Sequence, residues 1–195
     1  ALVLAGIPVM LHGPSGAGKT HLAAQVADAL GLEFGLHGAA MMGHELVGYQ
    51  DATGRYVETV LSRQFEGGGL TCLDEHDGGS ESAPLVVNAM LANGWMTKGP
   101  AMVKQSPDWR VIATANTVAG ASAAYTGRVR LDQATLQRYA LVHVDYLPSV
   151  EESITAGNTD WLSLCRAARA EATARGLPIV TGSYRDMSNG LRALS

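Results

Sequence analysis

Lysine is scarce in this chain of 195 residues, and charged residues as a whole are few. Of fourteen cationic residues only Lys19, Lys98 and Lys104 are lysines, and Asp, Glu, Lys and Arg together make up 16% of the sequence. The formal net charge is −4, so overall attraction to nucleic acid or to an anionic membrane surface is not indicated. A nucleic-acid partner would need a local basic patch, for which the composition gives no sign.

Cysteine is also rare. Cys72 and Cys165 lie far apart, without the spacing of a metal site, and favour two reduced thiols in a cytoplasmic protein. No apolar run approaches the ~20 residues of a membrane-spanning helix, so we expect no membrane partner. The six histidines show no paired ligand spacing, and we expect no metal site built on them.

Hydrophobic residues, in contrast, make up 47% of the chain, enough for a sizeable core. They form short apolar runs that alternate with helical patterns, which is typical of an α/β fold with a parallel sheet. The predicted strands are Ile7–Leu11, Glu33–His37, Leu70–Leu73, Arg110–Ala115 and Leu141–Tyr146. The predicted helices are Thr20–Leu30, Pro84–Ala92, Ser149–Ala156, Trp161–Arg175 and a last one from Tyr184.

The pattern becomes purely helical from Pro148 onward. We therefore place a domain boundary there, with an α/β core over 1–147 and a small helical lid, or part of one, over 148–195. Two stretches inside the core, Gly43–Glu58 and Gly94–Pro107, fit neither the strand nor the helix pattern. They are predicted as inserted hairpins or loops.

A glycine-rich segment between the first predicted strand and helix matches the phosphate-loop pattern G-x-x-x-x-G-K-[ST] in full. Its glycines let backbone N–H groups surround phosphate oxygens, and the following helix directs its positive end at the same anion. We expect Lys19 to reach the β- and γ-phosphates of ATP and the Thr20 hydroxyl to bind Mg²⁺. The predicted ATP-binding residues here are Gly13, Pro14, Ser15, Gly16, Ala17, Gly18, Lys19, Thr20 and His21.

Polar residues also end two other predicted strands. Asp74 and Glu75 follow Leu70–Leu73, where Asp74 is predicted to hold Mg²⁺ and Glu75 to polarise the attacking water. Next to them, His76 could line the γ-phosphate side. Asn116 ends the strand Arg110–Ala115, where an asparagine is either a turn former or a group that orients water.

Together these motifs resemble the AAA+ ATPases of the MoxR/dynein-related group. The resemblance rests on the phosphate loop, LTCLDE, RVIATANT and LDQATLQRYALVHVDYLPSVEE, and extends from about Ile7 to Leu147. Within that group, the segment ATANTVAGASAAYTGRVRLDQATLQRYALVHVDYLP is similar to the ATPase subunit of aerobic cobaltochelatase, the CobS-like proteins. His76 and Gly78-Gly79-Ser80 depart from the residues expected there in a chelatase subunit.

The resemblance implies a P-loop NTPase (AAA+) core with a five-stranded parallel sheet in the order 5-1-4-3-2. It also implies a hexameric ring in which Mg²⁺-dependent ATP hydrolysis remodels a partner protein, as in the motor for cobalt insertion into a corrinoid. Asn116 then falls on the sensor-1 position, Arg138 on the arginine finger that acts on a neighbour's ATP, and Arg185 on a sensor-2 position. Arg128 and Arg130 are rival finger candidates. The two inserted stretches correspond to hairpins that face the ring pore or the partner.

Three alternatives remain open from the sequence. One is a MoxR-type chaperone that activates another metalloenzyme or acts with an adaptor protein. Another is a motor associated with nucleic acid, possibly encoded by a virus, although few basic residues are available on the inserts. A small-molecule kinase is disfavoured, because Asp74, Glu75, Asn116 and Arg138 together form a hydrolase constellation.

Overall fold

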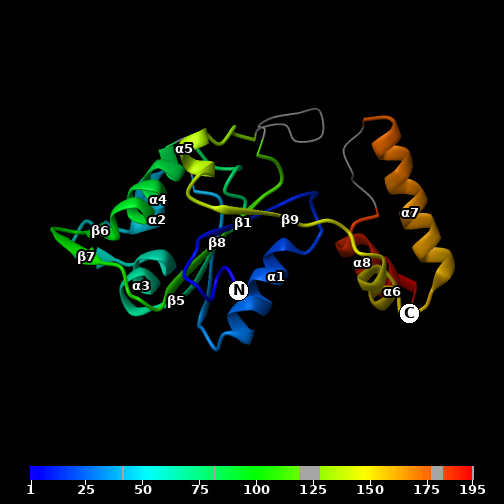
Figure 1. Cartoon of the computed structure of the whole chain (residues 1–195), viewed down its shortest axis with the longest axis horizontal. Helices are drawn as coiled ribbons and strands as arrows, with labels where there is room; N and C mark the ends of the chain where they lie inside the picture. The colour runs from blue at the N-terminus through cyan, green and yellow to red at the C-terminus, as the bar shows by residue number, and fades with distance from the viewer. Residues whose placement is uncertain (41, 81, 119–127, 177–181, 195) are drawn as a thin grey trace.

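A computed structural model describes residues 1–40, 42–80, 82–118, 128–176 and 182–194 (Figure 1). An α/β body and a group of three helices, α6, α7 and α8, lie side by side in it. None of the helices in these ranges is both long enough and apolar enough to cross a membrane.

A five-stranded parallel sheet runs through the α/β body in the order β2-β5-β8-β1-β9. Numbered as successive strands of this sheet, the order is 2-3-4-1-5, which confirms the predicted order 5-1-4-3-2 read from the other edge. The strands are β1 (Val9–His12), β2 (Phe34–His37), β5 (Gly69–Leu73), β8 (Trp109–Ala115) and β9 (Ala140–His143). Every residue of β5 is buried, as expected for an inner strand of a parallel sheet covered on both faces.

Successive side chains along a strand point to opposite faces of the sheet and pack into different hydrophobic cores. On one face Val9 and Leu11 of β1 pack with Ala23 and Ala27 of α1 (Lys19–Ala29). On the other face Met10 belongs to the larger core, which includes residues of α3 (Val60–Gly67) and α4 (Ser82–Asn93). The period-2 alternation of the strands therefore places helices on both faces.

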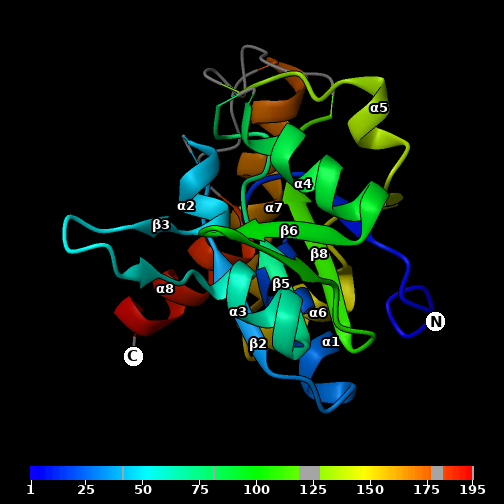
Figure 2. The same cartoon turned by 90° about the vertical axis from the view of Figure 1, so that its left-hand side faces the viewer.

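The first predicted insert, Gly43–Glu58, contains a short helix, α2 (Gly43–Val47), and a two-stranded hairpin, β3 (Tyr49–Gln50) and β4 (Tyr56–Val57). The second, Gly94–Pro107, contains the hairpin of β6 (Trp95–Lys98) and β7 (Ala101–Lys104). This second hairpin lies at the end of the body opposite α6–α8 (Figures 1 and 2). Lys98 joins the two inserts to α3, because its ammonium lies 2.5 Å from both Glu58 and Glu66.

Besides α2, two helices of the body were absent from our expectations. Thr59 caps α3 by accepting a hydrogen bond from the Ser62 amide at 3.0 Å, and α5 (Gln133–Leu136) is a single turn capped by Asp132. The last predicted strand, Leu141–Tyr146, in fact ends at His143. The Val144 amide still donates to the His12 carbonyl oxygen at 2.8 Å, and the chain then passes beside the phosphate loop.

The remaining helices are α6 (Pro148–Ile154), α7 (Thr159–Ala174) and α8 (Tyr184–Leu194). Leu162, Cys165 and Met187 form a small core of their own. Glu151 of α6 is buried and is held from α7 by Arg166, at 2.7 Å, and by Arg169. These helices occupy the segment in which we expected a lid.

Candidate functional site

The predicted phosphate loop joins β1 to α1 at the carboxyl edge of the sheet. Gly13, Gly16 and Gly18 have φ angles of 150°, 74° and 82°, in the region that glycine adopts without strain. At Gly13 space also forbids a side chain, since a Cβ atom there would lie 2.0 Å from the carbonyl oxygen of Val144. The glycines of the motif are therefore required by both the turn and the close approach of a neighbouring segment.

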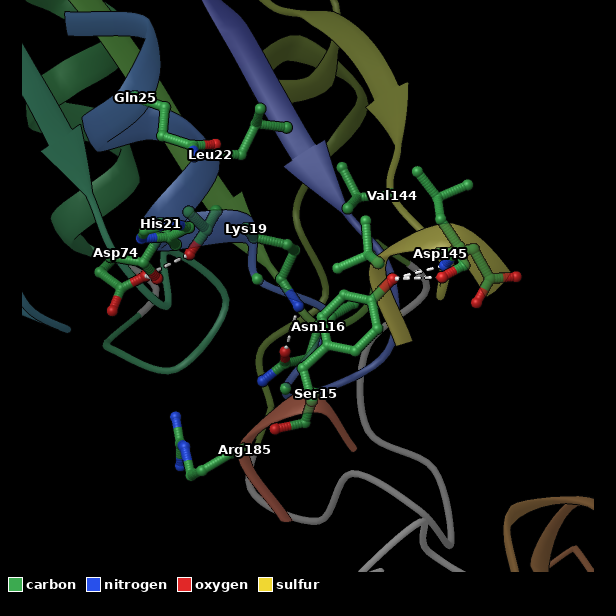
Figure 3. A pocket seen from close by; sticks show the side chains of 18 of the residues that line it. Ser15, Lys19, His21, Leu22, Gln25, Asp74, Asn116, Val144, Asp145 and Arg185 are labelled. Atoms are coloured by element: carbon green, nitrogen blue, oxygen red, sulfur yellow. Dashed lines mark hydrogen bonds between the residues drawn. The ribbon is translucent and has the colours of Figure 1, made fainter. Parts of the chain in front are cut away.

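Lys19 begins α1, and its ammonium group folds back into the loop. Nζ donates to the carbonyl oxygens of Gly13 at 2.8 Å and Pro14 at 2.9 Å, and to Oδ1 of Asn116 at 2.9 Å. Figure 3 shows Lys19 and Asn116 pointing toward each other. The end of β8 thus reaches the loop directly, as expected for adjacent parallel strands.

Burial lowers the pKa of Lys19 to about 8, although the charges of Asp77 and Asp74 act in the opposite direction. Within the described residues no carboxylate forms an ion pair with this ammonium group. Its positive charge is held only by neutral oxygen atoms and remains available to an anion in the loop.

Asp74 lies beside the loop at the end of β5. Its Oδ1 accepts hydrogen bonds from the Thr20 and Thr114 hydroxyls, each at 2.7 Å. A hydroxyl and a carboxylate at this spacing are the oxygen donors that Mg²⁺ prefers when phosphates complete its shell. No group of three or more His, Cys, Asp or Glu side chains in the described ranges could hold a metal without such help.

Glu75 follows Asp74 in an unusual backbone conformation. Its φ angle is 51°, and its amide donates to the Thr114 hydroxyl at 2.9 Å. Thr114 therefore fixes both acidic residues at the end of β5. A left-handed conformation in a non-glycine residue is often found at functional sites, where the surrounding structure compensates for the strain.

A cavity of about 640 Å³ opens next to these groups (Figure 3). Its volume lies in the ~300–1,000 Å³ range usual for small-molecule sites. The predicted residues that line it are residues 15–21, Asp74, Glu75, Asn116 and Arg185. Gly13 and Pro14 lie behind it with their carbonyl groups on Lys19, and Arg138 does not line it.

Apolar side chains close the other side of the cavity. They come from α1, from the segment after β9 and from α6: Leu22, Val144, Leu147, Val150 and Ile154. Arg185 enters from α8 and makes no ion pair within the described residues. The site therefore combines a cationic loop, an acidic strand end and an apolar wall.

Tyr146 connects the helical segment to the phosphate loop, a contact that the sequence analysis missed. Its hydroxyl donates to the Ser15 carbonyl oxygen at 2.6 Å. Arg169 of α7 stacks over its ring at 4.1 Å, and the Tyr184 ring meets it edge-on. A lone tyrosine after a strand carries no sequence signal for such a role.

The three candidate finger arginines differ in their surroundings. Arg138 is half-buried, and within the described residues it donates only to the backbone carbonyl groups of Asn88, at 3.2 Å, and Ala134. Arg130 is exposed. Arg128 is instead bound to Asp77 and Glu75 of its own chain. A role of Arg138 toward a neighbouring subunit stays a prediction.

His76 does not lie on the γ-phosphate side, so that interpretation was wrong. Its side chain packs edge-on against Tyr139 in the larger core, and only 8% of the residue is exposed. Burial lowers the pKa of His76 to about 4, and Nε2 has no hydrogen-bond partner within the described residues. His76 is a neutral core residue at neutral pH.

The fold and the loop define a P-loop nucleotide-binding domain. More narrowly, the chain belongs to the AAA domain family, dynein-related subfamily, whose model matches residues 8–139. It is 24% identical over 183 residues to the denitrification regulatory protein NirQ of Stutzerimonas stutzeri, which covers 88% of this chain. The chain spans 64% of the length of NirQ.

Solved structures share the fold. NtrX from Brucella abortus superposes with a TM-score of 0.64 and 19% identity, over 96% of this chain and 45% of NtrX. NtrX in complex with ADP superposes with a TM-score of 0.60 and 17% identity, over 95% of this chain and 44% of NtrX. At these identities the likeness concerns the fold alone.

Proposed function

We propose that this chain hydrolyses Mg²⁺-bound ATP at the cavity beside Lys19. The observation that carries the proposal is the convergence of Lys19, Asp74, Glu75 and Asn116 from three separate segments on one cavity. Family membership supports nucleotide binding in general.

Each residue has a role that follows from its position. Loop amides and the N-terminus of α1 bind phosphate oxygens, and Lys19 moves from its carbonyl partners to the β- and γ-phosphates. Thr20 and Asp74 would hold Mg²⁺, which neutralises developing charge on the phosphates when bound. Glu75 orients the attacking water, Asn116 helps to place it, and Arg185 contacts the phosphates from α8.

We further propose that hydrolysis drives the remodelling of a partner protein by a homo-oligomeric assembly in the cytoplasm, a hexameric ring. In this proposal residues 1–147 form the ATPase core and residues 148–195 form its lid. The CobS-like segment supports a chelatase-type client. The similarity to NirQ supports instead a MoxR-type chaperone that acts on another metalloenzyme, alone or with an adaptor. Co-purification of the tagged full-length protein with its partners, followed by mass spectrometry, distinguishes a chelatase subunit from another client.

Glu75→Gln tests the proposed hydrolysis. The substitution keeps the shape of the side chain and removes the carboxylate, so ATP binding is expected to persist while turnover falls by ~10²–10⁴-fold. Phosphate release measures turnover, and calorimetry with Mg²⁺ and ATP measures affinity. Glu33→Gln is the matched control, because the side chain of Glu33 forms an exposed ion pair with Arg63 away from the cavity lining. If Glu75→Gln retains wild-type turnover, another group must orient the attacking water.

The lowered pKa of Lys19 predicts a pH dependence of ATP affinity. Phosphates stabilise the ammonium form, so ATP binds the protonated state and raises the pKa in the complex. Below pH 8 Lys19 is mostly protonated in the free protein, so its titration changes the ATP affinity little. Above pH 8 binding takes up a proton, and affinity is expected to fall by up to about tenfold per pH unit. Calorimetry at pH 9 in buffers of different ionisation enthalpy measures this uptake; buffer-independent enthalpies would contradict it.

A further inference from the structure

Arg128 bridges two acidic side chains of its own chain. One guanidinium nitrogen lies 3.2 Å from Oδ1 of Asp77, and another lies 3.3 Å from Oε1 of Glu75. The Asp77 side chain is fully buried, the Arg128 side chain is 16% exposed and the Glu75 side chain is 53% exposed. The guanidinium is therefore anchored at the buried carboxylate and reaches outward to the one that borders the cavity.

The local backbone makes room for this bridge. A Cβ atom on Gly78 would lie 2.5 Å from the nearer guanidinium nitrogen, so the absence of a side chain there leaves the space that Arg128 occupies. The Val129 amide also donates to the Asp77 carbonyl oxygen at 2.8 Å. Both the side chain and the backbone of the Arg128 segment are thus attached to the acidic turn.

Asp77 extends the same network to the end of β8. Its Oδ2 accepts hydrogen bonds from the amides of Asn116, at 3.1 Å, and Thr117, at 3.0 Å. One buried carboxylate therefore connects Arg128 to the backbone of Asn116. Through Arg128, it also connects Asn116 to Glu75, the second residue that we assign to the attacking water.

We infer that Arg128 is a positioning residue of the site in its own chain: anchored on Asp77, it fixes the Glu75 carboxylate relative to Asn116. The inference rests on the proposed hydrolysis. Only Oε1 of Glu75 is bound by Arg128, and Oε2 accepts no hydrogen bond within the described residues, which leaves it for water. The charge of Arg128 is engaged by two carboxylates of its own chain, which favours a role in that chain.

The substitution Arg128→Lys separates positioning from folding. Lysine keeps a cation for buried Asp77 but lacks the planar fork that reaches two carboxylates at once. We expect unchanged ATP affinity and a fall in kcat on the order of 10²-fold, the usual effect of a misplaced reacting group. Arg128→Gln is the second variant and should show at least as large a loss. Arg63→Ala is the matched control, because it removes an arginine whose ion pair with Glu33 is exposed and lies far from Arg128 in the sequence.

Turnover and ATP affinity are measured on the full-length chain, with circular dichroism to follow folding. A parallel loss of affinity and turnover in Arg128→Lys would overturn the inference in favour of a structural role. A wild-type kcat in Arg128→Lys would overturn this inference and leave the proposed hydrolysis standing. Absence of ATP turnover in the unmodified chain would instead overturn the proposed function, and this inference with it.

Mixing distinguishes action within one chain from action on a neighbour. Arg128→Lys and Glu75→Gln both damage the same site in their own subunits, so assemblies that contain both should show only the summed turnover of the two separate variants. Native mass spectrometry verifies that both variants are present in one assembly. Turnover above that sum would make Arg128 a finger acting on the neighbour's ATP and would overturn the inference.

Discussion

Replacement of Lys19 by alanine is expected to abolish ATP binding. The Lys19 ammonium is buried in the phosphate loop and held by three neutral oxygen atoms, of Gly13, Pro14 and Asn116. It is therefore the cation that can transfer to the phosphates at little cost, since no ion pair within the described residues has to be broken. Removal also leaves the three oxygen atoms without their shared donor. Calorimetry with Mg²⁺ and ATP should detect no binding at concentrations that saturate the wild type.

The matched control for this prediction is Lys104→Ala. Lys104 is an exposed lysine on β7, in the hairpin at the opposite end of the body from the helical segment. Its loss changes the net charge by the same amount and should leave ATP affinity as in the wild type. An affinity of Lys19→Ala within a few-fold of the wild type would refute the assignment of the loop as the phosphate site.

Arg138→Ala is expected to bind ATP normally and to lose ~10³–10⁵-fold in turnover, the range known for arginine fingers in phosphoryl transfer. Arg138 does not line the cavity of its own chain, and among the residues that the structure describes its guanidinium donates to backbone carbonyl groups alone. Its charge is thus available to a neighbouring site, where it would stabilise charge that develops on the γ-phosphate. Turnover should also rise steeply with protein concentration. Arg175→Ala, at an exposed ion pair on α7, is the control.

A mixture of Arg138→Ala with Glu75→Gln tests whether Arg138 acts on a neighbour. Each variant is inactive alone, but a mixed ring contains interfaces at which an intact Glu75 meets an intact Arg138 from the next subunit. Partial recovery of phosphate release is therefore expected. If mixed assemblies form and remain inactive, Arg138 is only a structural residue that ties α5 to α4.

The strands of the core were predictable because they are short and apolar, and the inner strands β1, β5 and β8 are also largely buried. β5 is the clearest example, since the predicted strand Leu70–Leu73 differs from the buried strand Gly69–Leu73 only by one residue at its start. The placement of Asn116 beside the loop depends on β8 lying next to β1. That adjacency is a property of strand order, which the family resemblance supplied and the local sequence does not contain.

Other parts of the site depend on contacts between segments that are distant in the sequence. In the sequence Asp77 is an acidic residue beside glycines, with no motif that indicates a role. Its contacts with the end of β8 and with Arg128 exist only in the folded chain. The adjacent His76 was assigned to the wrong side because a turn reverses the direction of successive side chains. Such placements follow from tertiary packing and not from local propensity.

Tyr146 links the helical segment α6–α8 to the phosphate loop of the proposed nucleotide site. Its hydroxyl is bound to the backbone of the phosphate loop at Ser15, while its ring is covered by Arg169 of α7. If the loop rearranges when nucleotide binds, the stability of the α6–α8 docking changes with it, and the coupling free energy is the same in both directions. A partner protein that prefers one docked position of these helices would then change the affinity of the chain for ATP. ATP would change the affinity of the chain for that partner by the same factor.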